Sequence, residues 1–131
     1  MVISMTSRTR LLVVDDDPDL RQLLKTYFEA KDGYEVLEAE DAKVGLASAA
    51  SGRPQLIVAD LAMPRMSGLD FIAAVRQHPD LKHIPIVVCT ARQSTVEALH
   101  CLRVGANAFF PKPMDMDAFR AKIKELLGHP A

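Results

Sequence analysis

Residues 11–18 read LLVVDDDP, and this short stretch decides the fold. Its first four residues have the length and composition of a buried strand, which has no use for the carboxylates of Asp15 and Asp16. Asp17 is a good helix cap, and Pro18 suits the first position of a helix. The stretch therefore predicts a strand that leads directly into a helix, with two acidic side chains at the strand's carboxyl end.

Three further apolar runs end in the same way. They lead into Asp60, Thr90 and Lys112, and a segment of helical periodicity follows each of them. Because the carboxyl ends of parallel strands meet at one edge of a sheet, these side chains are expected to gather beside the two aspartates. The whole chain predicts five strands alternating with five helices in a mostly parallel sheet. The expected strands are residues 11–14, 34–39, 56–59, 84–89 and 106–110.

The composition indicates one globular domain. The chain has 131 residues, of which 49% are hydrophobic, enough for a core without disulfides or metal ions. The formal net charge is −1 and the basic residues are dispersed, so no direct contact with nucleic acid is expected. Cys89 and Cys101 lack the spacing of a metal or redox site and are interpreted as buried thiols. No apolar stretch is long enough to span a membrane, and a cytoplasmic location is expected.

The motifs VVDDDP, LIVADLAMPRMSGLD, PIVVCTA and FFPKP, taken in this order, resemble the marks of the response-regulator receiver domain of two-component signalling. The resemblance implies the CheY-like, flavodoxin-like fold, a doubly wound α/β domain with five parallel strands in the order 2-1-3-4-5. It covers nearly the whole chain. The receiver domain is expected at residues 9–128, after a flexible extension at 1–8 and before a short tail at 129–131.

The resemblance also implies a role for each residue at the strand ends. Asp60 would accept a phosphoryl group from a sensor histidine kinase or a histidine phosphotransfer protein, and Lys112 would balance its charge. Thr90 would move toward the phosphoryl group, which allows Phe109 to turn inward. The fourth helix, fifth strand and fifth helix would then present an altered face to an unknown downstream protein. The Lys112-Pro113 peptide bond is often cis in this family.

Three neighbouring carboxylates repel one another unless a cation compensates them, and a hard divalent ion such as Mg²⁺ suits oxygen ligands. By resemblance, Asp16 and Asp60 would bind Mg²⁺ directly with the backbone carbonyl of Ala62, and Asp15 would act mainly through a water. Ala62 and Arg92 occupy the family's variable positions that tune the lifetime of the phosphoryl group. The chain is thus expected to be a signalling switch of a phosphorelay and not an enzyme with an external substrate.

Three further interpretations stay open from the sequence. The chain resembles a stand-alone regulator, but a receiver module excised from a longer regulator or hybrid kinase would look similar. The apolar helix at residues 95–104 could dock a partner or, after activation, a second copy. Asp15 and Asp17 also fit the opening motif of haloacid-dehalogenase-type hydrolases, but Asp19 departs from that motif.

Two further side chains receive structural interpretations. Phe110 is assigned to the core, because neighbours on a strand point to opposite faces of the sheet and Phe109 takes the switch position. His129 is expected to face solvent as a loop residue.

Overall fold

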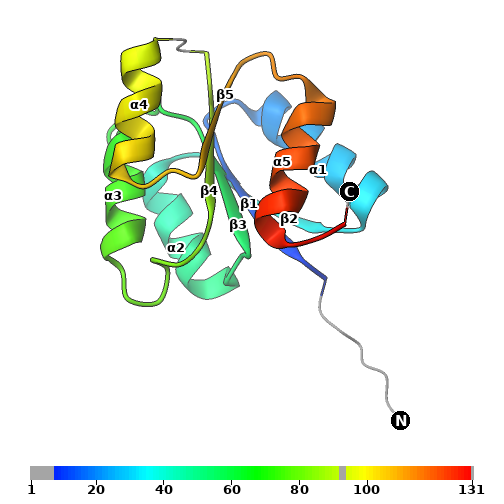
Figure 1. Ribbon diagram of the computed structural model, residues 1–131. Helices are drawn as coiled ribbons and strands as arrows, with labels where there is room; N and C mark the ends of the chain where they lie inside the picture. The colour runs from blue at the N-terminus through cyan, green and yellow to red at the C-terminus, as the bar shows by residue number, and fades with distance from the viewer. Residues whose placement is uncertain (1–7, 92–93, 131) are drawn as a thin grey trace.

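The structure is a computed structural model that describes residues 8–91 and 94–130. Most of the predicted extension at 1–8 and the predicted lifetime residue Arg92 therefore lie outside the described residues. Within them, strands and helices alternate along the chain (Figure 1). The strands are β1 (Arg10–Val14), β2 (Glu35–Ala39), β3 (Leu56–Ala59), β4 (Ile86–Thr90) and β5 (Ala108–Pro111), and the helices are α1 (Pro18–Asp32), α2 (Ala42–Gly52), α3 (Gly68–Gln77), α4 (Thr95–Val104) and α5 (Met116–Leu127).

The strands form one parallel sheet in the order β2-β1-β3-β4-β5, which confirms the predicted topology. Helices α2, α3 and α4 cover one face of the sheet, and α1 and α5 cover the other (Figure 1). Neighbouring residues of β1 divide between the two cores: Leu12 packs with Phe71 of α3, and Leu11 packs with Phe28 of α1. Because both faces are covered, the central strands β3 and β4 are buried at every position.

Helix α1 begins as the sequence predicts. The Asp17 carboxylate accepts hydrogen bonds from the backbone amides of Asp19 and Leu20, and Pro18 is the first helical residue. The helix ends at Gly33, whose left-handed φ of 67° suits glycine. After this turn the chain enters β2 at the edge of the sheet.

Strands β4 and β5 begin two residues later than predicted. Strand β4 starts after Pro85, which has no amide hydrogen for the ladder, while the Ile84 amide is used in a turn with the Leu81 carbonyl. Strand β5 starts at Ala108, because the amide of Ala106 closes the end of α4. In both places a local turn takes the backbone groups that the apolar pattern had assigned to a strand.

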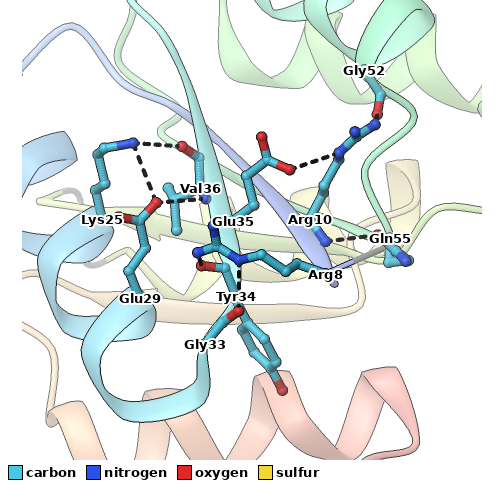
Figure 2. Close-up of polar contacts among 10 residues, drawn as sticks. All are labelled: Arg8, Arg10, Lys25, Glu29, Gly33, Tyr34, Glu35, Val36, Gly52 and Gln55. Carbon is cyan, nitrogen blue, oxygen red and sulfur yellow. Dashed lines mark hydrogen bonds and ion pairs between the residues drawn. The ribbon is translucent and has the colours of Figure 1, made fainter. Parts of the chain in front are cut away.

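The edge strand β2 is partly shielded by helix α1. Lys25 Nζ lies 3.4 Å from the Val36 carbonyl oxygen, and the Val36 amide donates to Glu29 Oε2 at 3.3 Å (Figure 2). These are backbone groups that a parallel edge strand would otherwise leave open to another chain. The side chains of α1 therefore protect the edge as well as covering the face.

The amino ends of β1 and β2 are tied by an arginine. Arg10 donates from Nε to Glu35 Oε1 at 2.9 Å and from its guanidinium to the Gly52 carbonyl oxygen at 2.8 Å (Figure 2). One side chain thus joins two strands to the end of α2. No helix among the described residues is long and apolar enough to cross a membrane.

Candidate functional site

Three carboxylates lie together where β1 and β3 end. Oxygen atoms of Asp15, Asp16 and Asp60 all lie within 4.8 Å of one another. The strand register explains this, because Val14 pairs with Ala59 and the acids follow directly in both strands. Asp15 and Asp60 are buried, whereas Asp16 is exposed. The sheet therefore brings together the three acids that the sequence singled out.

Lys112 joins the same cluster from the end of β5. Its Nζ lies 2.7 Å from Asp15 Oδ2 and 3.1 Å from Asp60 Oδ2, and its backbone amide donates to the Thr90 carbonyl oxygen. Burial alone would lower the pKa of Lys112, but the hydrogen bonds to the two carboxylates outweigh it and hold this pKa above its ordinary value. Lys112 is therefore a permanent positive charge within the site at neutral pH.

The carboxylates outnumber the ammonium group that contacts them. Burial raises the pKa of Asp15, although hydrogen bonds from Lys112 and from the Asp17 amide act in the opposite direction. The nearby charge of Asp60 raises this pKa further. Carboxylate oxygens at this spacing with unbalanced negative charge fit a hard divalent cation, and the donor set is of the kind that Mg²⁺ and Ca²⁺ prefer.

The loop after β3 holds Asp60 in place. The Ala62 amide donates to Asp60 Oδ1 at 3.1 Å, and the Gly68 amide donates to the Leu61 carbonyl oxygen at 3.0 Å. A Cβ atom on Gly68 would lie 2.5 Å from Leu61 Cα and closer still to the Asp60 carbonyl oxygen. Only glycine lets the start of α3 pack this tightly against the backbone of Asp60.

The remaining predicted residues lie on β4 and β5. Thr90 is fully buried at the carboxyl end of β4. Phe109 is half-buried against the core under α2, α3 and α4, whereas Phe110 packs edge-on to Phe119 in the opposite core, with ring centroids 5.3 Å apart. Phe110 is therefore a core residue, as predicted. The Lys112-Pro113 bond is cis, as the resemblance implied.

Sequence reasoning missed one cation beside the site. Arg21 of α1 donates a hydrogen bond from its guanidinium to the backbone carbonyl oxygen of Asp15, and a second from Nε to Glu38 Oε1 at 3.1 Å. In the sequence Arg21 is one charged residue among several on a helix, and its partner lies 17 residues further along the chain. No local pattern singles it out.

Fold and site together define the class: a doubly wound α/β domain with an acidic, lysine-containing site at the carboxyl edge of its parallel sheet. The family model of the response regulator receiver domain matches residues 11–124, and the chain belongs to that family. Receiver domains are signalling switches, and this membership excludes the haloacid-dehalogenase alternative.

Relatives of the chain include both regulators and a kinase. It is 38% identical over 118 residues to the response regulator MprA of Mycolicibacterium vanbaalenii, covering 90% of this chain and 50% of MprA. It is 34% identical over 119 residues to the KDP operon transcriptional regulatory protein KdpE of Escherichia coli, covering 91% of this chain and 51% of KdpE. It is also 32% identical over 126 residues to histidine kinase P4 of Formosa agariphila, covering 96% of this chain and 9% of the kinase. The chain thus spans about half of the two regulators and a small part of the kinase.

Solved structures show the same fold at full domain length. The chemotaxis protein CheY4 of Vibrio cholerae superposes with a TM-score of 0.83 at 30% identity, over 92% of this chain and 99% of CheY4. The receiver domain of the Francisella response regulator 1452 superposes with a TM-score of 0.84 at 26% identity, over 92% of this chain and 98% of that domain.

Proposed function

We propose that this chain is a phosphoacceptor switch of a two-component system and that Asp60 is the residue phosphorylated. The observation that carries the proposal is the setting of the Asp60 carboxylate. It is buried at a strand end, contacts the ammonium group of Lys112, and lies beside two further aspartates that could share a divalent cation with it. Family membership supports the phosphoacceptor role in general.

The proposed reaction is the transfer of a phosphoryl group from a phosphohistidine of a sensor kinase or a histidine phosphotransfer protein. An oxygen of Asp60 forms a bond to phosphorus while the phosphorus–nitrogen bond breaks. The imidazole leaves with the electron pair and takes a proton from solvent. The product is an acyl phosphate on Asp60, and most of the catalysis comes from in-line positioning and charge compensation.

Each surrounding group has a task in this proposal. Lys112 already contacts Asp60 and would offset the charge of the phosphoryl oxygens. Mg²⁺, held by Asp16, Asp60 and the Ala62 carbonyl, would supply charge stabilisation for the phosphoryl oxygens. Asp15, whose oxygens accept hydrogen bonds from the Asp17 amide and from Lys112, would act on the cation mainly through a water.

The conformational response would run through β4 and β5. The hydroxyl of Thr90 would move toward the phosphoryl oxygens, and Phe109, which is half-buried now, would become more buried. The phosphoryl group can bias this equilibrium only by binding the two states differently. Ala62 is exposed beside the site and would shield the acyl phosphate little from water; Arg92 would act on the same lifetime.

The output surface would be the face formed by α4, β5 and α5, and its occupant a downstream protein. On α4 the side chains of Val96, Leu99 and Leu102 are 74%, 60% and 43% exposed. If activation controls this face, Leu102→Asp should abolish the gain in partner affinity that beryllofluoride and Mg²⁺ produce. An equal gain in the variant would contradict this part of the proposal, and a monomer-to-dimer shift on activation would identify a second copy as the occupant.

The chain either acts alone or is the receiver part of a longer protein. Its coverage of half of MprA and KdpE supports the second form, and its full-length agreement with CheY4 supports the first. In a longer protein, a DNA-binding output would belong to a further domain.

The test is phosphorylation in vitro with Mg²⁺ and a small-molecule phosphodonor, read by intact mass and by mapping of the modified residue. The wild type should gain one phosphoryl group on Asp60, and Asp60→Asn should gain none. Asp15→Asn should still be labelled, more slowly. Labelling that survives Asp60→Asn but is lost in Asp15→Asn would refute the assignment.

A further inference from the structure

The three carboxylates of the site differ in how firmly they are held. Asp15 accepts hydrogen bonds from the Asp17 amide and Lys112, and Asp60 accepts them from the Ala62 amide and Lys112. By contrast, no group within residues 8–91 and 94–130 donates a hydrogen bond to the exposed carboxylate of Asp16. The direction of the Asp16 side chain therefore depends on the backbone that carries it.

That backbone is held by Arg21. Its guanidinium donates to the carbonyl oxygen of Asp15, which belongs to the peptide group joining Asp15 to Asp16. The same guanidinium is fixed from the other side by Glu38 of β2 at 3.1 Å, and the Arg21 side chain is only 15% exposed. A planar guanidinium with two fixed partners restricts the orientation of the peptide group that it binds.

We propose that Arg21 is a positioning residue for the divalent cation: it fixes the Asp15–Asp16 peptide so that the Asp16 carboxylate points into the site, and Glu38 fixes Arg21. This inference rests on the proposed cation-dependent function. Metal sites commonly depend on such supporting contacts, whose loss weakens metal binding without removing a ligand.

The sign of the effect separates positioning from simple electrostatics. The positive charge of Arg21 repels a cation bound nearby, so its removal would by charge alone strengthen Mg²⁺ binding. Loss of positioning weakens Mg²⁺ binding. The two explanations therefore predict opposite changes in the same dissociation constant.

The chain offers a matched control in Arg10. Arg10 makes the same pair of contacts as Arg21, from Nε to a glutamate of β2 and from its guanidinium to a backbone carbonyl oxygen (Figure 2). These contacts lie at the amino end of β1, whereas the three acids lie at the carboxyl ends of the strands. Arg10→Gln therefore removes a comparable tie to β2 away from the site.

The experiment measures the Mg²⁺ dissociation constant by calorimetry and the melting temperature in EDTA for the wild type, Arg21→Gln, Glu38→Gln and Arg10→Gln. Arg21→Gln should bind Mg²⁺ about tenfold more weakly, and Glu38→Gln should show a smaller loss of the same sign. Arg10→Gln should lower the melting temperature but keep the wild-type affinity. Arg21→Lys, which keeps the charge but not the planar fork, should fall between the wild type and Arg21→Gln and covers the case in which the glutamine variant does not fold.

Unchanged or tighter Mg²⁺ binding in folded Arg21→Gln would overturn the role of Arg21 and leave the proposed function standing. An equal loss of affinity in Arg10→Gln would also overturn it, because the effect would then be general destabilisation. Failure of the proposed function has a different signature, since the wild type itself would bind no Mg²⁺ and would not be phosphorylated.

Discussion

Replacing Gly68 by alanine should test how tightly the start of α3 fixes Asp60, the proposed phosphoacceptor. The new Cβ would lie 2.5 Å from Leu61 Cα and 3.0 Å from the Asp60 carbonyl carbon, both backbone atoms that cannot rotate away. The φ angle of Gly68 is not in the left-handed region, so the whole effect is steric. The helix and the loop must separate, and we expect a loss of about 3 kcal/mol, the upper end for overpacking.

Gly33 provides the matched control. A Cβ there meets nothing within 4 Å, but its φ of 67° strains any other residue. Gly33→Ala should therefore cost about 1 kcal/mol from backbone strain alone. Gly33 lies at the end of α1, far along the chain from Asp60, so this variant should retain the wild-type phosphorylation rate.

Urea unfolding of the two variants gives the free energies, and the rate of Asp60 phosphorylation gives the effect on the site. A displacement of the Asp60 backbone by about 1 Å should slow the transfer on the order of a hundredfold. If Gly68→Ala were as stable as Gly33→Ala and reacted at the wild-type rate, the reasoning that this contact positions Asp60 would be wrong.

Two further predictions concern charged groups. Hydrogen bonds from Arg120 hold the pKa of the Asp32 carboxyl below its ordinary value, and the Asp32 side chain is 3% exposed. Asp32→Asn should therefore cost about 2 kcal/mol at neutral pH. Because the folded-state pKa is lowered, this difference should persist above the ordinary carboxyl pKa of about 4 and disappear as the pH falls through the lower folded-state value. A difference in unfolding free energy that stays constant on acidification would contradict this. Lys112→Met removes the ammonium group that contacts Asp15 and Asp60, so Mg²⁺ should raise the melting temperature of the variant more than that of the wild type. Equal shifts in a thermal melt would show that Lys112 does not share charge compensation with the cation.

The sequence predicts the parts of this fold that depend on local patterns. The run from residue 11 to residue 18 contains a complete strand end, a cap and a helix start, and each of these interactions spans only a few residues. The same holds for the gathering of Asp15, Asp16 and Asp60, since the parallel order alone brings the ends of β1 and β3 together. Local chemistry and one topological rule are enough for the acids of the site.

The parts that the sequence did not predict depend on contacts between distant segments. His129 was expected to face solvent, but it is only partly exposed, and its Nδ1 lies 2.7 Å from the hydroxyl of Tyr34, 95 residues earlier in the chain. Asp32 and Arg120 are 88 residues apart. No periodicity connects such pairs, because the sheet and its two helical layers must form before the side chains can meet.

The two cations beside the acidic site act on different parts of it. Lys112 contacts side-chain oxygens of Asp15 and Asp60, where it reduces repulsion and occupies hydrogen-bonding positions. Within the site, Arg21 contacts only the backbone carbonyl oxygen of Asp15 and bonds to none of the three aspartate carboxylates, because its other hydrogen bond goes to Glu38. Asp16 is the one carboxylate of the three that accepts no hydrogen bond from the described residues. If Arg21 bonded to that carboxylate, it would compete with an incoming cation for it. If the site binds a divalent cation as proposed, a protein cation bonded to the Asp15–Asp16 peptide group supports Asp16 without competing with that ion for its carboxylate.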